Sequence, residues 1–148
     1  MTLEIFIPGQ IRGKQRPFFL KKTGIAITPK QTVSYENLMK TIFRQKYPEH
    51  IPISSGEPIE LIMIANYSVP ASTSKKKKLK MLDGSIKPTK KPDCDNILKL
   101  TDGLNKIAFD DDRQIVDVRL VKKYSEIEGL TIRISTINNN KPEIILDA

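Results

Sequence analysis

Apolar residues alternate with polar ones, or run together, in four segments that predict β-strands. These segments are rich in β-branched and aromatic residues, and turn residues bound them. The segment 59–69 is apolar almost throughout, which predicts a long buried strand, and 130–137 alternates, which predicts a half-buried one. Residues 125–129 form a short turn, so we expect the two strands that flank it to pair with each other in antiparallel orientation. The four segments are 3–7, 59–69, 114–124 and 130–137.

A helical period of apolar residues predicts a core-facing helix that begins near Thr32 or Ser34 and ends at Pro48. We expect a second helix over 95–105, whereas 74–82 fits either a short basic helix or part of a mobile loop. The apolar face of the first helix consists of Tyr35, Leu38, Met39, Ile42, Phe43 and Tyr47.

The predicted order of elements is strand, basic loop, helix, strand, basic loop, helix, strand, strand. This order is typical of a single α+β domain with two main helices and a mixed or antiparallel sheet. A short hairpin is expected near 18–27, inside the first loop. We place the domain at 1–137 and expect 138–148 to be a poorly ordered tail.

Composition excludes several classes of protein and of site. No apolar run approaches the roughly 20 residues of a membrane span, and the first residues lack the basic start and cleavage site of a signal peptide. A single cysteine, Cys94, excludes an internal disulfide and a CxxC zinc site, and a single histidine, His50, excludes multi-histidine metal sites. We therefore expect a cytoplasmic protein in which carboxylates hold any metal.

The charge of the chain is large and unevenly distributed. The net charge of +8 indicates a polyanionic partner, either nucleic acid or an anionic membrane. Residues 75–91 contain eight lysines and one aspartate, and residues 93–112 contain six aspartates and two lysines. An ordinary solvated surface mixes the two signs, whereas here a basic segment leads directly into an acidic one.

The acidic segment has the spacing of a carboxylate site. Asp93 and Asp95 are two residues apart, which places both on one side of an extended segment. Asp95 would start the helix, at the positive end of its dipole. Lys99 and Asp102 follow on the same helix face. If the strand that begins at Asp112 packs beside this helix, its carboxylate can meet Asp93 and Asp95 at the helix N-terminus.

Three convergent carboxylates repel one another unless a cation neutralises them. Mg²⁺ prefers oxygen ligands and keeps waters that a substrate phosphate can displace. Such a site polarises a phosphodiester and orients the attacking water. Lys99 would add positive charge where the transition state becomes negative. The pattern therefore predicts a metal-dependent phosphodiester site with Asp93, Asp95, Lys99 and Asp112 as catalytic residues.

Each piece of this pattern has an ordinary interpretation when taken alone. The segment 93–96 can be a plain helix cap, and 110–112 can be a solvated turn. A calcium loop is excluded because 97–101 lacks the necessary oxygen ligands and glycine. A nuclease of the PD-(D/E)xK type fits Pro92-Asp93, but the second half of its motif is approached only by 117–119.

The segment 91–123 resembles the RusA family of Holliday-junction resolvases. The matching residues are Lys91-Pro92-Asp93-Cys94-Asp95-Asn96-Ile97-Leu98-Lys99, Asp102-Gly103-Leu104-Asn105, Asp111-Asp112-Arg113-Gln114-Ile115-Val116 and Val121-Lys122, and the basic loop with Gly13-Lys14-Gln15-Arg16-Pro17 is also similar. Asp102 follows Lys99 by three residues, where members of the family often have four.

The resemblance implies that Asp93, Asp95 and Asp112 bind Mg²⁺ or Mn²⁺ and that Lys99 is needed for cleavage. It further implies a homodimer that binds four-way junction DNA and nicks two opposing strands, with no organic cofactor. Recombination and repair, often of phage or prophage origin, are the implied setting. The alternative is a non-catalytic basic DNA-binding protein, a prophage relic that retains the fold, but the four intact site residues argue against it.

The basic residues beside the acidic site are predicted to contact DNA phosphates, so binding should fall steeply with salt. Phe18 and Phe19 have two interpretations, a wedge into the junction centre or, more favoured, packing within a hairpin core. The long strand 59–69 and the basic region that follows it are the candidates for a dimer interface. The predicted phosphate-binding residues are Arg12, Lys14, Arg16, Lys75, Lys76, Lys77, Lys78, Lys80, Lys90 and Lys91.

Overall fold

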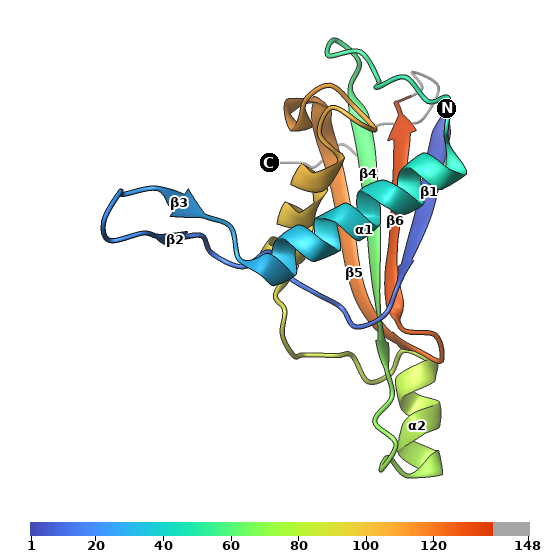
Figure 1. Ribbon diagram of the computed structural model, residues 1–148. Helices are drawn as coiled ribbons and strands as arrows, with labels where there is room; N and C mark the ends of the chain where they lie inside the picture. The colour runs from blue at the N-terminus through green and yellow to red at the C-terminus, as the bar shows by residue number, and fades with distance from the viewer. Residues whose placement is uncertain (138–148) are drawn as a thin grey trace, which may run out of the picture.

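A four-stranded mixed sheet forms the centre of the protein, which is described here from a computed structural model over residues 1–137 (Figure 1). The strand order is β1–β6–β4–β5; β6 is antiparallel to both of its neighbours, and β4 and β5 are parallel. These strands are β1 (Thr2–Pro8), β4 (Ile59–Ser68), β5 (Ile115–Ser125) and β6 (Gly129–Thr136).

One face of this sheet is buried under the longest helix, α1 (Lys30–Lys46), which lies across the strands (Figure 1). Met39 and Phe43 of α1 are buried, in agreement with the predicted apolar face, whereas Leu38, which is predicted on the same face, is exposed. The helix begins before the predicted cap at Thr32, because the Thr32 hydroxyl instead accepts a hydrogen bond from the Gln15 backbone N–H at 3.1 Å. Alternate residues of the central strand complete this core, namely Ile59, Leu61, Met63, Ala65 and Tyr67.

The predicted pairing of the last two strands is wrong. β5 and β6 run in opposite directions, but β4 lies between them and pairs with both. The apolar β4 takes the central position, where burial is greatest, whereas β5, which carries Asp117, Arg119 and Lys123, takes the edge. The sheet is therefore mixed, and the segment that contains the candidate site connects its two parallel strands, β4 and β5.

Three α-helices are present in the described part of the chain, where two main ones are predicted. The segment that fits either a helix or a loop is the helix α2 (Lys75–Leu82), and the Ser74 hydroxyl caps it by accepting from the Lys77 N–H at 3.3 Å. The next helix, α3 (Cys94–Leu98), starts one residue after Asp93 and tightens into the 3₁₀ helix η1 (Lys99–Leu104). The predicted tail 138–148 lies outside the described residues.

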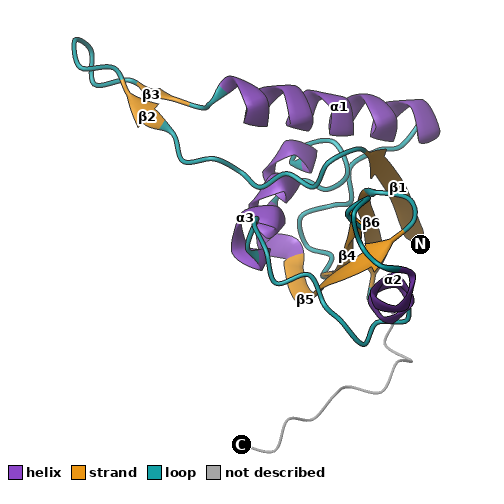
Figure 2. Ribbon diagram, turned by 90° about the horizontal axis from the view of Figure 1, so that it is seen from below, coloured by secondary structure: helices purple, strands orange, loops and turns teal. Residues whose placement is uncertain are grey.

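A short hairpin of β2 (Phe18–Phe19) and β3 (Ala26–Ile27) projects away from the body of the protein (Figure 2). Its position confirms the predicted hairpin near 18–27. The favoured expectation that Phe18 and Phe19 pack into a core is wrong, because both side chains are exposed. Within residues 1–137, no helix is long and apolar enough to cross a bilayer.

Candidate active site

The first turn of α3 presents the predicted acidic motif to solvent. Asp93 is the N-cap residue, and its backbone carbonyl accepts from the N–H groups of Asn96 and Ile97 at 3.1 and 3.2 Å. Its carboxylate is exposed and accepts a side-chain hydrogen bond from Asn96 Nδ2 at 2.9 Å. Asn96 therefore orients Asp93, a role that the sequence interpretation missed and that its position three residues after a cap residue could have indicated.

Asp95 and Lys99 form an ion pair across one turn of this helix. Lys99 Nζ lies 3.1 Å from Asp95 Oδ2, and both side chains are largely exposed. This contact confirms that the spacing of four residues places both groups on one face. Exposed pairs of this kind contribute little to stability, so the ammonium of Lys99 can move to another anion at small cost.

Hydrogen bonds link the residues just before α3 to the C-terminal half of β5. Lys122 Nζ donates to the carbonyl oxygens of Lys90 and Pro92, and the Tyr67 hydroxyl donates to the Pro92 carbonyl at 3.4 Å. Burial raises the pKa of Tyr67 to about 12, which keeps this hydroxyl protonated. The Lys90 ammonium lies over the rings of Tyr67 and Tyr124, at 5.4 and 5.7 Å from their centroids.

The three consecutive aspartates 110–112 have different partners. Asp110 Oδ2 accepts from the Ser55 N–H at 3.1 Å. Asp111 caps the short 3₁₀ helix η2 (Asp112–Gln114) and accepts from the Arg113 N–H at 2.9 Å, a hydrogen bond that holds the pKa of Asp111 below its ordinary value. Asp110 and Asp111 thus stabilise the turn through backbone N–H groups. Asp112 is the exposed residue of the three.

Asp112 lies close to other acids. A hydrogen bond shared with Asp111, then burial and the negative charge of Asp102, raise the pKa of Asp112 above its ordinary value. A raised carboxyl pKa of this origin indicates that the neighbouring acids disfavour the charged form of Asp112. Asp112 therefore has the electrostatic environment in which a cation would displace a proton.

Gln114 holds this turn in place from inside the protein. It is buried, its Nε2 donates to the carbonyls of Ile53, Ser54 and Glu57 at 3.2, 2.7 and 3.1 Å, and its Oε1 accepts from the Asp111 N–H at 2.9 Å. Together with Asp111 it forms a capping box. The sequence interpretation missed this role, although Gln three residues after an Asp cap is the signal for it.

Among residues 1–137, Asp112 does not join Asp93 and Asp95 in a group that could hold a metal ion. Pro92 contacts Lys122 near the end of β5, whereas Asp112 lies three residues before Ile115, where β5 begins. Because α3 and η1 run back along the strand, Asp112 approaches Asp102 rather than Asp93.

The basic loop that follows β1 is fixed to η1 and α1. Lys14 Nζ lies 2.9 Å from Asp102 Oδ2 and 3.4 Å from Glu36 Oε1. Burial alone would lower the pKa of Lys14, but its hydrogen bond to Asp102 and the two carboxylate charges together raise it. Lys14 has internal partners for its charge, whereas Arg16 is exposed. The predicted contact of Lys14 with a DNA phosphate therefore competes with its two ion pairs.

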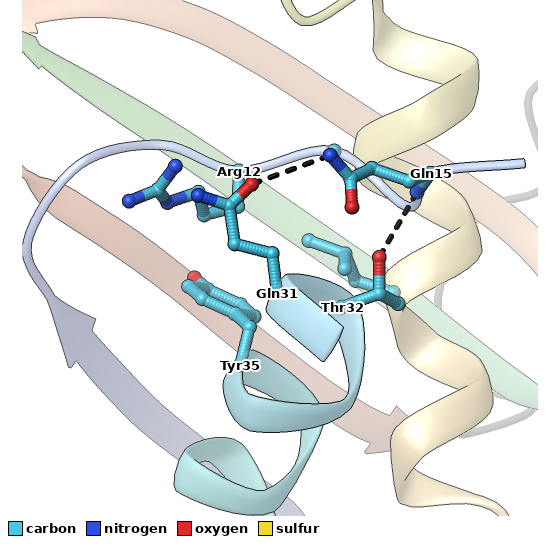
Figure 3. A pocket seen from close by; sticks show the side chains of 7 residues that line it. Arg12, Gln15, Gln31, Thr32 and Tyr35 are labelled. Atoms are coloured by element: carbon cyan, nitrogen blue, oxygen red, sulfur yellow. Dashed lines mark hydrogen bonds between the residues drawn. The ribbon is translucent and has the colours of Figure 1, made fainter. Parts of the chain in front are cut away.

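The same loop docks on the start of α1 (Figure 3). Gln15 Nε2 donates to Gln31 Oε1 at 3.3 Å, and the Gln15 N–H donates to the Thr32 hydroxyl. Arg12 lies beside Tyr35, whose pKa burial raises to about 12 against the opposing charge of Arg12. These hydrogen bonds hold in place the backbone that carries the predicted phosphate-binding residues of this loop.

The lysines of α2 are all exposed, whereas Met81 on the same helix is buried. The helix lies at the end of the sheet where β4 finishes (Figure 1). This surface offers a concentrated positive charge with no acid on the helix itself. Its lysines are Lys75, Lys76, Lys77, Lys78 and Lys80.

Comparison with known proteins decides the family. Residues 8–135 match the family model described as endodeoxyribonuclease RusA. The chain belongs to the RusA family. Its similarity to the uncharacterized protein YqaN of Bacillus subtilis (strain 168) is 32% identity over 111 residues, which cover 74% of this chain and 78% of that protein. The RusA family acts on Holliday-junction DNA, and its resolvases generally depend on a divalent metal.

The RusA motif of this chain supplies oxygen donors, which are the ligands that a hard divalent cation prefers. All the candidate ligands are carboxylate oxygens, and the raised pKa of Asp112 shows crowded negative charge. In arrangement, the acids of one chain form two groups, Asp93 with Asp95 and Asp102 with Asp112. Among residues 1–137, no three His, Cys, Asp or Glu side chains gather closely enough to hold a metal.

Proposed function

We propose that this RusA-family protein is a Mg²⁺-dependent, structure-selective endonuclease that resolves four-way DNA junctions by paired nicks. The observation that carries the proposal is the exposed first turn of α3, where Asn96 orients Asp93 and Lys99 pairs with Asp95. Carboxylates beside a lysine are the groups that metal-assisted phosphodiester hydrolysis requires. Membership in the RusA family supports the same class of reaction.

In this proposal Asp93, Asp95 and Asp112 come together around the cation when the junction binds, and Mn²⁺ can replace Mg²⁺. The bound ion would polarise the phosphodiester and lower the pKa of a water ligand. Lys99 leaves its ion pair with Asp95 and donates to the phosphate oxygens, where negative charge grows in the transition state. Asn96 keeps the Asp93 carboxylate in position through its side-chain amide.

The symmetry of the substrate favours a homodimer. A four-way junction has approximate twofold symmetry, so two identical chains deliver two matched nicks. The lysines of α2 and the arginines of the loop after β1 would then contact the phosphates of the arms. We place this activity in the cytoplasm, in recombination and repair, with no organic cofactor.

Nicking of a synthetic four-way junction and of linear duplex, in Mg²⁺ or in EDTA, tests the proposal. We expect Mg²⁺-dependent nicks in two opposing strands of the junction and little cleavage of duplex. Asp93→Asn should abolish nicking and retain junction binding, and Lys99→Met should slow nicking by about 100- to 1,000-fold. Asp117→Asn removes a matched exposed aspartate of β5 and should nick at the wild-type rate.

One observation favours a second candidate, a non-catalytic DNA-binding protein that retains the fold and the charge of the family. Within the described residues, no three carboxylates are arranged so that they could hold a metal ion. The same assay separates the candidates: a wild-type protein that binds junctions but never nicks them, in Mg²⁺ or Mn²⁺, supports the second. Equal cleavage of duplex and junction would reject the structural selectivity and keep the nuclease.

A further inference from the structure

The β2–β3 hairpin is an arm that carries its apolar side chains in solvent. It projects from the body in both views (Figures 1 and 2). The exposed fractions are 51% for Phe18, 68% for Phe19, 41% for Leu20 and 57% for Ile25. So many exposed apolar side chains on one projecting element mark a site of interaction.

The hairpin has regular pairing but no core of its own. Phe18 pairs with Ile27, and the Leu20 N–H continues the ribbon by donating to the Ile25 carbonyl at 3.0 Å. Gly24 closes the turn with a φ of +68°, which favours glycine. Since alternate residues of a ribbon share a face, Phe18 and Leu20 lie on one face and Phe19 on the other. A two-stranded ribbon cannot bury these side chains, so a partner must cover them.

The charge of the arm identifies that partner as a polyanion. No Asp or Glu occurs between Glu4 and Glu36, and the arm and its base carry Arg16, Lys21 and Lys22. These three side chains are exposed. Aromatic side chains between cations are the combination that binds unpaired nucleic-acid bases, because rings stack on bases while cations contact phosphates. A purely apolar protein partner would not need the cations.

The base of the arm is fastened to the candidate active site. The Lys14 N–H donates to the Asn96 carbonyl at 2.8 Å. Gly13 packs so closely that a Cβ there would lie 2.7 Å from Pro92 Cβ and 3.0 Å from Asn96 Cβ. Asn96 is the residue that orients Asp93. DNA held at α3 would therefore meet the arm at a fixed direction from the scissile phosphate.

We propose that the arm inserts Phe18 and Phe19 at the branch point of the junction, where base stacking is interrupted between the arms, and stacks them on the bases that it opens there. Linear duplex stacks without interruption, so the arm confers preference for branched DNA. Residues Arg16, Lys21 and Lys22 contact the flanking phosphates. This inference rests on the proposed function, because it takes the junction as the ligand, but it concerns binding rather than cleavage.

Fluorescence of 2-aminopurine placed at the crossover of a synthetic junction tests the inference in EDTA, where no cleavage is needed. The wild-type chain should raise the fluorescence as the base leaves its stack, and Phe18→Ala with Phe19→Ala should remove this rise. The double variant should lose about 10-fold or more in junction affinity. Its affinity for linear duplex should change less than about twofold, because the cations remain. Ile51→Ala, a control at another exposed apolar residue, should behave as wild type.

The outcomes separate this inference from the proposed function. A fluorescence rise that needs the two phenylalanines supports the inference even in a protein that never nicks. An unchanged rise and an unchanged junction preference in the double variant overturn it even if nicking is normal. A variant that keeps the rise but shifts from dimer to monomer in sedimentation also overturns it, because the arm then contacts a second copy. Thermal unfolding monitored by circular dichroism should show that all variants fold.

Discussion

Lys14 Nζ lies 2.9 Å from Asp102 Oδ2, and this contact ties the basic loop after β1 to the end of the acidic helical segment. The same ammonium lies 3.4 Å from Glu36 on α1. One lysine thus joins three elements that are distant in sequence. It also neutralises part of the charge of Asp102, the acid that Asp112 approaches.

Lys14→Met should lower the free energy of unfolding by about 0.5–1 kcal/mol, since the lost pairs are partly exposed. Urea denaturation measures this effect. Lys21→Met removes an exposed lysine of the projecting hairpin and should leave the unfolding free energy unchanged. An equal loss of stability in both variants would show that the Lys14 pairs do not hold the loop.

Gln114→Ala should destabilise the protein by about 2–4 kcal/mol, because it removes three hydrogen bonds to the carbonyls of Ile53, Ser54 and Glu57 and opens the capping box. Urea denaturation again gives the value. Arg113→Ala, one residue earlier and exposed, should cost less than about 0.5 kcal/mol. A small effect at Gln114 would contradict its assignment as the residue that fixes the turn before Asp112.

The raised pKa of Asp112 predicts a pH dependence of stability with a definite sign. A carboxyl whose pKa is higher in the folded state favours folding while it is protonated, and this contribution disappears as the pH rises through the folded pKa. Wild type should therefore lose stability relative to Asp112→Asn as the pH rises from about 3.8 through the weakly acidic range. Urea denaturation across this range, with Asp117→Asn as control, checks it. A difference that stays constant with pH would refute the crowding of Asp102, Asp111 and Asp112.

The exposed lysines of α2 should set much of the salt dependence of DNA binding. Lys76→Gln combined with Lys80→Gln removes two charges from one helix face while keeping a good helix former. The slope of log K against log salt should become shallower by about 0.9 for each lysine that contacts a phosphate. Binding titrations at several salt concentrations measure the slope, with Lys40→Gln on α1 as control. An unchanged slope would mean that this helix face is only solvated.

The spacing of apolar residues along the chain predicts most helices and strands of this fold, but it does not predict which strands pair with each other in the sheet. The periodic face of α1, with Met39 and Phe43, and the apolar β4 follow from spacing alone. The order of strands depends on competition for the buried central position, which no single segment encodes. β4 takes that position because the residues on its core face, from Ile59 to Tyr67, are all apolar and buried, and it separates β5 from β6.

The candidate site divides in the same way between local and long-range features. The Asp95–Lys99 pair is local, so its spacing of four residues predicted it. The relation of Asp112 to α3 depends on the direction in which α3 runs along β5, and the contact of Lys122 with Pro92 sets that direction. The exposed Phe18 and Phe19 also escaped prediction, since a short apolar hairpin looks the same in sequence whether it packs or projects.

Binding of Mn²⁺, followed by electron paramagnetic resonance on the protein bound to an uncleavable four-way junction, tests the central claim most directly. The account predicts that Asp93→Asn, Asp95→Asn and Asp112→Asn each weaken Mn²⁺ binding by about 10-fold or more, whereas Asp117→Asn binds as wild type. Wild-type Mn²⁺ affinity in Asp93→Asn or in Asp112→Asn would contradict a shared carboxylate site.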